Sequence, residues 1–261
     1  MRLTFAVAGL AAVLTLGPAG CGDPAGTPTA RAGEGGVSGT VNVFAAASLT
    51  ESFTTLGKRF EAAHRGATVT FNFAGSSALA TQINQGAPAD VFASAAPANM
   101  STVTAAGNAA GTPTTFVRNQ LVIAVAKGNP KKIAGLSGLT GPGIKVALCA
   151  EAVPCGAAAR TALDASGAAL TPVTLEQDVR AALAKVKLGE VDAALVYRTD
   201  AKASSGDVDA IEFPESAKAV NEYPIVVLRK AANAAGARAF VDYVLSADGR
   251  SVLTGAGFQA P

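Results

Sequence analysis

The sequence has 261 residues, of which 49% are apolar and 15% charged, and its formal net charge is +2. This length and apolar content supply an ample core and exclude a disordered chain. The basic residues are dispersed, which argues against nucleic-acid binding, because such proteins cluster their basic residues. One histidine and three cysteines disfavour a histidine-rich metal site. Aromatic residues make up 5% and tryptophan is absent, which disfavours a stacking site for sugars or bases.

Residues 1–20 have the pattern of a signal peptide. The second residue is basic, and the apolar run from Leu3 to Leu16 is shorter than the roughly 20 residues that a membrane span needs. Small residues then lead to Cys21, as in bacterial lipoprotein signals, where this cysteine is lipidated after cleavage. Pro18 stands where such signals usually have leucine, so plain cleavage near Ala19 is the alternative.

Residues 21–39 are rich in glycine, proline, threonine and alanine without periodicity, which predicts a flexible tether. With lipid on Cys21, the tether would hold an exported domain at the extracytoplasmic side of the cell membrane. Without lipid, the protein would be soluble in the periplasm or secreted. No later segment offers about 20 uninterrupted apolar residues, so we expect no membrane span.

Two cysteines remain beyond the signal, Cys149 and Cys155, six residues apart. Thiols outside the cytoplasm tend to oxidise, so we expect a local disulfide between them. Such a short loop gains modest stability, and the bond would chiefly fix the conformation of the segment that it closes. Two buried free thiols are the alternative.

From Val41 onwards the chain alternates strand and helix patterns. The run VNVFA suits a buried strand, and Ser48 with Glu51 three residues later matches a capping box, which predicts a helix beginning at Ser48. The apolar run at 121–126 is continuous, as in a parallel strand buried on both faces. Further strands are expected at 68–73, 90–93, 145–148, 191–197 and 225–228. Further helices are expected after Ser76, from Pro154, from Glu176 and around Phe240.

This alternation predicts the α/β class with largely parallel sheets, and about ten strands with eight helices favour two lobes. Several strand-to-helix turns carry small or hydroxyl residues. In α/β sheets such turns line the crevice where ligands bind, and helix N-termini there present free N–H groups to anions. Several converging turns would hold a small dianion without lysine or arginine. Serine is also a preferred helix cap, so a purely structural role for each serine is the alternative.

Six segments occur in order along the chain: VFAAASLTESF, FAGSSALATQINQGAPADVFASA, VPCG, EQDVRAAL, LVYRTDA and EYPIVVL. With these segments in this order the chain resembles the molybdate-binding proteins of bacterial ABC uptake transporters, and the match extends over nearly all of residues 41–261. The resemblance implies a two-lobed type II periplasmic-binding-protein fold, with mainly parallel sheets flanked by helices and the oxyanion between the lobes. Lobe 1 would comprise residues 40–118 and 222–261, and lobe 2 residues 119–221.

The resemblance also implies the donors to the oxyanion. They are the hydroxyls of Ser48, Ser76 and Tyr197 and the backbone N–H groups of Cys155 and Val179. Ser77 is an alternative to Ser76, because Gly75 replaces the first serine of the family's usual triplet. Cys155 stands where the family typically has alanine, and a disulfide there could shift the turn. The only metal expected is the molybdenum of the bound ligand.

The chemistry of the donors agrees with this ligand. Molybdate, tungstate and sulfate are full dianions near pH 7 and only accept hydrogen bonds, whereas phosphate keeps a proton and needs an acceptor. Asp178 lies near the expected site, but a helix-capping role would occupy its oxygens. Sulfate would be rejected by size, and molybdate and tungstate are too alike to separate. The resemblance further implies an ABC permease partner, a monomer, and neither a cofactor nor nucleic acid.

Three other functions compete with this hypothesis. A hydrolase would use Ser48 or Ser76 with His64 as the base, but His64 would lie about 24 Å along the helix from Ser48, and no G-x-S-x-G motif is present. A binding protein for sulfate, phosphate, ferric ion or an organic acid is the second. Ferric ion would need paired tyrosines. An organic acid would need an arginine in the cleft, whereas Arg160, Arg180 and Arg198 are expected to face solvent. A lipoprotein sensor or adhesin without a transport partner is the third.

Overall fold

The computed structural model describes residues 37–261. The predicted signal peptide and Cys21 lie outside the described residues, so export and lipidation stay predictions. The predicted tether 21–39 reaches into the described part, where the first strand, β1, already begins at Ser38 instead of Val41. Within residues 37–261, no helix has the length and apolar character needed to cross a membrane.

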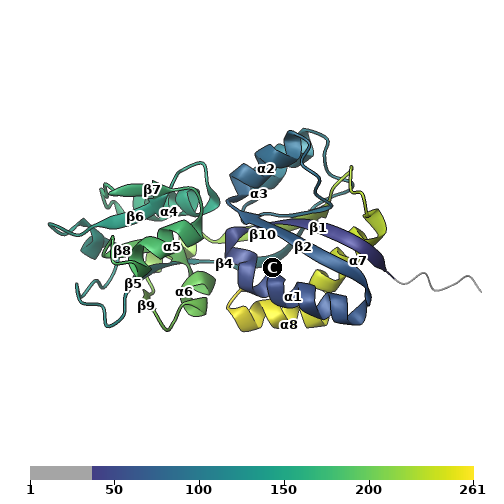
Figure 1. Cartoon of the computed structure of the whole chain (residues 1–261). Coiled ribbons are helices and arrows are strands. Elements are labelled where there is room, and N and C mark those ends of the chain that lie inside the picture. Colours follow the sequence, from purple (N-terminus) through teal and green to yellow (C-terminus); the bar gives the residue numbers. More distant parts are fainter. Residues whose placement is uncertain (1–36) are drawn as a thin grey trace, which may run out of the picture. The chain divides into compact units, whose positions relative to one another are not determined.

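Ten strands form two five-stranded sheets in the described part of the chain (Figure 1). The first sheet has the order β2-β1-β3-β10-β4 and the second β7-β6-β8-β5-β9. The first is built from Ser38–Ala46 (β1), Gly66–Ala74 (β2), Val91–Ala93 (β3), Thr114–Asn119 (β4) and Asn221–Val227 (β10). The second is built from Leu121–Ala126 (β5), Val146–Cys149 (β6), Thr174–Glu176 (β7), Ala193–Tyr197 (β8) and Val208–Ile211 (β9). The elements of each sheet and its helices are called lobe 1 and lobe 2 below.

The α/β class and the two sheets agree with the sequence analysis, but the strand directions are evenly mixed. Each sheet contains two parallel and two antiparallel pairings. The prediction that 121–126 forms a parallel strand was wrong, because β5 runs antiparallel to both β8 and β9. Its continuous apolar sequence reflects burial on both faces, which helices provide whatever the strand direction.

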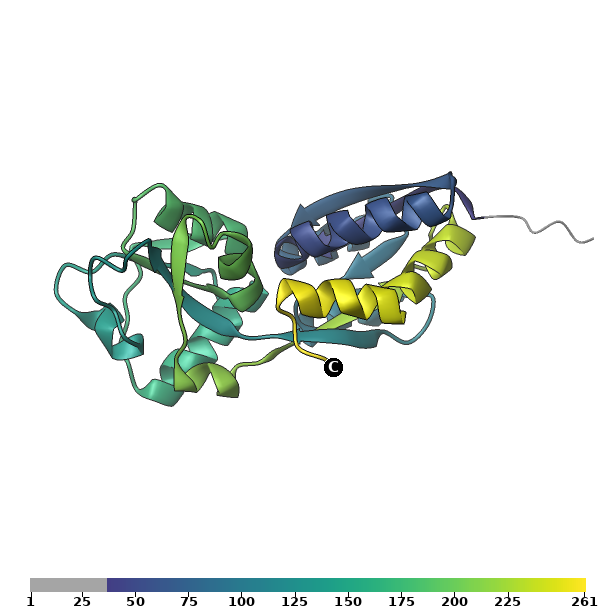
Figure 2. The same ribbon diagram turned by 90° about the horizontal axis from the view of Figure 1, so that it is seen from below.

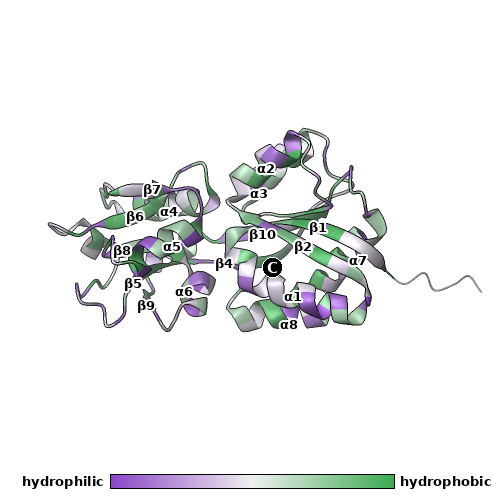
Figure 3. Cartoon of the chain, viewed as in Figure 1, coloured by the Kyte–Doolittle hydropathy of each residue, from purple (hydrophilic) through white to green (hydrophobic). Residues whose placement is uncertain are grey.

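The helices of lobe 1 pack around a phenylalanine cluster. Phe53 of α1 contacts the rings of Phe71, Phe116 and Phe240, with centroids 5.8–6.3 Å apart. Helices α1 and α8 lie side by side over this core (Figure 2). Apolar residues dominate the strands, while polar residues mark the outer surface of the helices (Figure 3). The helices are Thr50–Ala63 (α1), Ser76–Asn84 (α2), Pro97–Ala105 (α3), Ala234–Leu245 (α7) and Ala247–Ala256 (α8).

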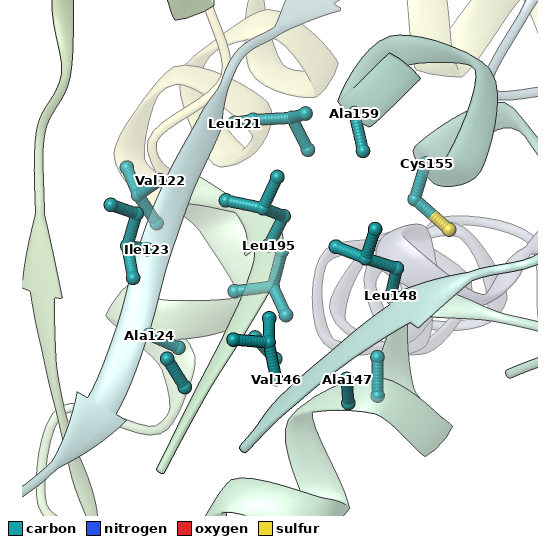
Figure 4. Close-up of a cluster of buried hydrophobic side chains, with 14 of the residues drawn as sticks. Leu121, Val122, Ile123, Ala124, Val146, Ala147, Leu148, Cys155, Ala159 and Leu195 are labelled. Carbon is teal, nitrogen blue, oxygen red and sulfur yellow. The ribbon is translucent and has the colours of Figure 1, made fainter. Parts of the chain in front are cut away.

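Lobe 2 has an aliphatic core in which β5, β6 and β8 face helix α4 (Figure 4). A disulfide joins Cys149 at the end of β6 to Cys155 in the first turn of α4, with the Cα atoms 5.7 Å apart. Its α-helices are Pro154–Ser166 (α4), Val179–Lys187 (α5) and Arg198–Ala203 (α6), and two short 3-10 helices cover Leu136–Thr140 (η2) and Pro214–Lys218 (η3).

The chain passes between the lobes twice, and the two passages lie side by side. It leaves the first sheet at Asn119 and returns at Asn221, and these two residues pair in the β4–β10 ladder. One residue further into lobe 1, Arg118 and Glu222 form an ion pair at 3.0 Å. Both lobes belong to a single compact unit.

Two predicted helix starts were wrong. Helix α1 begins at Thr50, not Ser48, because a 3-10 turn (η1, Ala47–Leu49) separates it from β1, and no side chain caps it. Helix α5 begins at Val179, not Glu176, because residues Thr174–Glu176 pair with β6 as strand β7. Helices α3, α6 and α8 were missed. Helix α3 carries almost no apolar period and α6 has only six residues, whereas α8 follows α7 almost directly.

Helix α8 offers a matched test of the packing. A Cβ atom at Gly249 would lie well inside van der Waals contact with the carbonyl oxygens of Val244 and Tyr243, whereas a Cβ at Gly255 would meet no atom within 4 Å. Gly249→Ala should therefore lower the free energy of unfolding by about 1–3 kcal/mol. Gly255→Ala should raise it by up to about 1 kcal/mol, because alanine favours the helix. Urea denaturation measures both, and equal effects would contradict this packing.

Candidate functional site

One cavity between the lobes is lined by all five residues that the sequence analysis singled out. Ser48, Ser76, Cys155, Val179 and Tyr197 surround a small space of about 10 Å³. Ser77 is not part of this lining. The remaining lining residues are small or apolar apart from Asp178, and no lysine, arginine or histidine of residues 37–261 takes part. The hydrogen-bonding groups of the lining are therefore neutral apart from the Asp178 carboxylate.

Helix starts supply the backbone donors. Ser76 is the first residue of α2, Cys155 the second of α4, and Val179 the first of α5. The first N–H groups of a helix lack an acceptor within the helix, and they carry a partial positive charge. Because strands β2 and β6 and the β7 segment end at the cavity, these N–H groups converge there and favour an anion.

The hydroxyl of Ser48 is held by a tyrosine that the sequence analysis did not select. Ser48 Oγ lies 2.9 Å from Oη of Tyr223, which is fully buried in β10. The Asn119 side-chain amide lies 3.4 Å from the same phenol oxygen and 2.8 Å from Oγ1 of Thr199, donating to both. In the sequence, the only sign of a role for Tyr223 was its hydroxyl at the start of an apolar run.

Proton positions in this chain follow from the groups themselves. Burial raises the pKa of Tyr223 well above its usual range, so the phenol keeps its proton. Asn119 can only donate through its amide nitrogen, so the Tyr223 proton is free to point to Ser48. Ser48 then accepts from Tyr223 and has its own proton available for the cavity.

The hydroxyl of Ser76 also has its proton available for the cavity. Its Oγ accepts a hydrogen bond from the N–H of Ala95 at 3.0 Å, which leaves the hydroxyl proton free to donate. The preceding Gly75 lies against the carbonyl oxygen of Gln177 in lobe 2, and a Cβ atom there would clash with it. A glycine therefore lets the two backbones meet beside the cavity.

Tyr197 supplies a buried hydroxyl without a partner. It is 1% exposed, and its Oη has no hydrogen-bond partner among residues 37–261. Its ring packs edge-on against Tyr223, with centroids 6.0 Å apart. Burial raises its pKa well above the usual range, so it is a neutral donor. An unpaired buried hydroxyl costs about 1–3 kcal/mol, and an acceptor in the cavity would remove that cost.

The Cys155 turn depends on a close backbone contact. A Cβ atom at Gly156 would clash with the carbonyl oxygens of Cys149 and Ala150, so glycine is needed where the disulfide loop folds against α4. The disulfide is compatible with a helix start at this place, and Cys155 remains in the cavity lining.

Asp178 caps α5 as predicted. Its Oδ1 accepts from the N–H groups of Arg180 and Ala181 at 2.8 and 3.0 Å. The lone carboxylate of the lining is thus engaged through its Oδ1 atom by its own helix.

The predicted capping box of Ser48 and Glu51 does not form. Ser48 is turned to Tyr223 inside the 3-10 turn, and Glu51 pairs with Arg180 of lobe 2. Arg180 is exposed, as expected, and its guanidinium also pairs across the lobes. His64 lies at the C-terminal end of α1, packed on the ring of Phe60 and absent from the cavity lining.

Residues 37–261 contain no cluster of three or more histidine, cysteine, aspartate or glutamate side chains able to hold a metal ion. The site as described can instead surround a compact anion with hydrogen-bond donors from both lobes.

Comparison with known proteins connects this site to a family. A family model described as bacterial extracellular solute-binding protein matches residues 41–259. The molybdate-binding protein ModA of Mycobacterium tuberculosis is 47% identical over 254 residues, covering 97% of this chain and 96% of its own. ModA of Escherichia coli is 35% identical over 230 residues, covering 84% and 89%. The solved periplasmic molybdate-binding protein of Azotobacter vinelandii shares the fold with a TM-score of 0.73 at 20% identity, covering 85% of this chain and 99% of its own.

The family match spans most of the chain, and the curated relatives match along nearly their full length. The two sheets flanked by helices agree with the fold shared with the solved structure. The chain therefore belongs to the bacterial extracellular solute-binding proteins, a family of transport proteins that bind solutes without transforming them.

Proposed function

We propose that this chain binds molybdate outside the cytoplasm and delivers it to the permease of an ABC importer. The observation that carries the proposal is a cavity of neutral donors between two lobes: three hydroxyls and two helix N–H groups, with no basic side chain in the lining. The names of the curated relatives support the same ligand. We extend the proposal to tungstate, because the two dianions have nearly the same size.

The donor set favours a fully ionised oxyanion. Ser48, Ser76 and Tyr197 each have a proton free for the cavity, so each acts on the ligand as a donor. A protonated phosphate would need an acceptor, and the Oδ1 atom of Asp178 is taken by the start of α5. Sulfate is the second candidate, since it is also a dianion, and it would differ by its smaller size.

The two lobes would move relative to each other when the anion binds. Lobe 1 would comprise residues 40–118 and 222–261, and lobe 2 residues 119–221, with the paired passages at Asn119 and Asn221 as hinges. Closure would bury the anion and present a joint surface of both lobes to the permease.

The proposal also covers the predicted cellular context. Residues 1–20 would direct export, lipid on Cys21 would anchor the monomeric protein at the membrane, and Cys149 and Cys155 would be oxidised there. A lipoprotein sensor with the same ligand but no permease is the alternative, and a loss of molybdate uptake on deleting the gene would argue against it.

Ligand choice can be tested by thermal unfolding of residues 22–261 with molybdate, tungstate, sulfate or phosphate at one concentration. A ligand at 100 times its Kd adds about 2.7 kcal/mol to the free energy of unfolding. We expect a large rise in Tm with molybdate and tungstate, and little with sulfate or phosphate. A rise with sulfate alone would favour the second candidate, and no rise with any of the four would reject an oxyanion ligand of this kind.

The donor roles predict different effects for two substitutions. Tyr197→Phe removes a hydroxyl that lacks a protein partner, so affinity for molybdate should fall by roughly 1.5–3 kcal/mol while the ligand-free Tm stays or rises. Ser48→Ala should lower affinity by a similar amount and also lower the ligand-free Tm, because Tyr223 loses its acceptor.

Isothermal titration and unfolding of the same samples separate the two effects. Tyr243→Phe is the control, since this tyrosine lies on α7 away from the cavity lining and packs on Phe60. Unchanged affinity in both site variants would remove the assigned donors.

Reduction of the Cys149–Cys155 bond should loosen the turn that carries the Cys155 N–H. We expect the free energy of unfolding to fall by about 2 kcal/mol, as for other short loops, and molybdate affinity to fall slightly. The measurement is titration with and without a reductant. The double variant Cys149→Ser, Cys155→Ser should show the lower affinity and no response to reductant. An identical affinity in all samples would show that the bond does not position this donor.

A further inference from the structure

A second cavity lies next to the anion cavity, between helices α1, α5 and α6. It encloses about 250 Å³, and its lining brings together Glu51 of lobe 1 with Arg180 and Asp200 of lobe 2. Glu51 follows Ser48 by three residues, and Arg180 directly follows Val179. The charged side chains of the second cavity are therefore attached to the same turns that carry the proposed anion donors.

Asp200 is an isolated carboxyl group in this cavity. The residue is 3% exposed, and neither carboxyl oxygen has a hydrogen-bond partner among residues 37–261. Burial, and secondly the charge of Glu51, raise the pKa of Asp200 to about 8. A buried carboxylate without a partner is costly, so the group is neutral at pH 7 in this arrangement. A buried polar group left unpaired calls for a physical reason.

Arg180 is the cation that could pair with Asp200, and it is engaged elsewhere. Its guanidinium is bound to Glu51, and both side chains are about half exposed. The charge of Arg180 nevertheless acts on Asp200 by lowering its pKa. The other cation of the lining, Lys187, pairs with Asp207 at 2.7 Å.

Two of these three residues lie in lobe 2 and the third lies in lobe 1. Arg180 and Asp200 belong to lobe 2 and keep their neighbourhood through the contact of α5 with α6, while Glu51 belongs to lobe 1. Any separation of the lobes removes Glu51 from Arg180 and leaves Arg180 beside the buried carboxyl.

We infer that Arg180 is a positioning residue with two alternative partners: Glu51 across the lobes when the anion is enclosed, and Asp200 within lobe 2 when the lobes part. Glu51 thereby favours the enclosed anion and Asp200 opposes it, so the two acidic residues set anion affinity in opposite directions. The inference rests on the proposed function, because it concerns the affinity of that same site.

The ionisable groups around Asp200 allow the pH effect to be assigned. Those that act on it or line its cavity are Glu51, Asp178, Arg180, Lys187, Tyr197 and Tyr223. Strand β5 carries no ionisable side chain, and Asp209 of β9 is held by Lys127. The charged residues of α8, Asp248 and Arg250, lie outside the cavity lining.

The direction of the pH effect follows from proton linkage. In the arrangement described, with Arg180 bound to Glu51, Asp200 has a raised pKa of about 8, and pairing with Arg180 would lower it. Between these two values, enclosure takes up a proton. Molybdate affinity should therefore fall as the pH rises towards about 8, by at most about tenfold per pH unit, and level off above it.

The experiment measures molybdate affinity by titration from pH 6 to pH 9 for the full exported chain and three variants. Asp200→Asn mimics the neutral carboxyl, so its affinity for molybdate should not change with pH. It should bind molybdate more tightly than the wild type, by a factor that grows up to pH 8. Glu51→Gln should bind two- to fivefold more weakly and show a weaker pH dependence, because Arg180 is then free to pair with Asp200 in both states and the charge of Glu51 no longer raises the pKa of Asp200. Arg180→Gln should flatten the profile, because both pairings are lost.

Matched controls are Arg160→Gln and Glu212→Gln, which break ion pairs within lobe 2 and should leave the profile unchanged. A wild type that binds no tetrahedral dianion contradicts the proposed function, and the inference then falls with it. If the wild type binds molybdate with the same pH profile as Asp200→Asn, the exchange of partners by Arg180 is wrong, while the proposed function stands. If Asp200→Asn does not fold, a wild-type profile retained in Arg180→Gln overturns it equally.

Discussion

A doubly charged anion enclosed without a basic side chain must be stabilised by hydrogen-bond donors alone, and each donor must have its proton free. This constraint accounts for the polar contacts around the cavity. Asn119 can only donate to Tyr223, so the phenol proton is free for Ser48, and a Ser48 that accepts it keeps the serine proton for the cavity. The N–H of Ala95 does the same for Ser76. The neighbours of the donors thus fix the direction of the hydrogen bonds before any ligand arrives.

The sequence was sufficient for the α/β class and for most strands, because apolar runs followed by small or hydroxyl residues mark strand-to-helix turns. The five lining residues came from the resemblance to the molybdate-binding proteins. The sequence was not sufficient for Tyr223, whose hydroxyl acts from a strand that is far from Ser48 in the chain. The capping-box pattern at Ser48 failed for a related reason. A long-range hydrogen bond and a cross-lobe ion pair took the two side chains that a local rule assigns to each other.

Glycine has a particular use where the lobes meet. At Gly75 the missing side chain lets the backbone of α2's first turn touch the carbonyl of Gln177, directly beside the donors. A larger residue at this position would push the two backbones apart directly beside the proposed donors. This contact and the Glu51–Arg180 pair join the turns of Ser48 and Ser76 in lobe 1 to the turn of Val179 in lobe 2, so the contacts between the lobes lie next to the proposed donors.

The strand order of the first sheet also bears on how the chain reaches its native state. Strand β10 lies between β3 and β4 but comes about a hundred residues later in the sequence. Until residues 221–227 have been made, β3 and β4 both present unpaired edges, which are sites of aggregation. The second sheet uses only residues 121–211 and has no such dependence. During synthesis, then, the lobe that begins first is completed last, and a chain cut short at residue 220 would keep a complete second sheet beside an open first one.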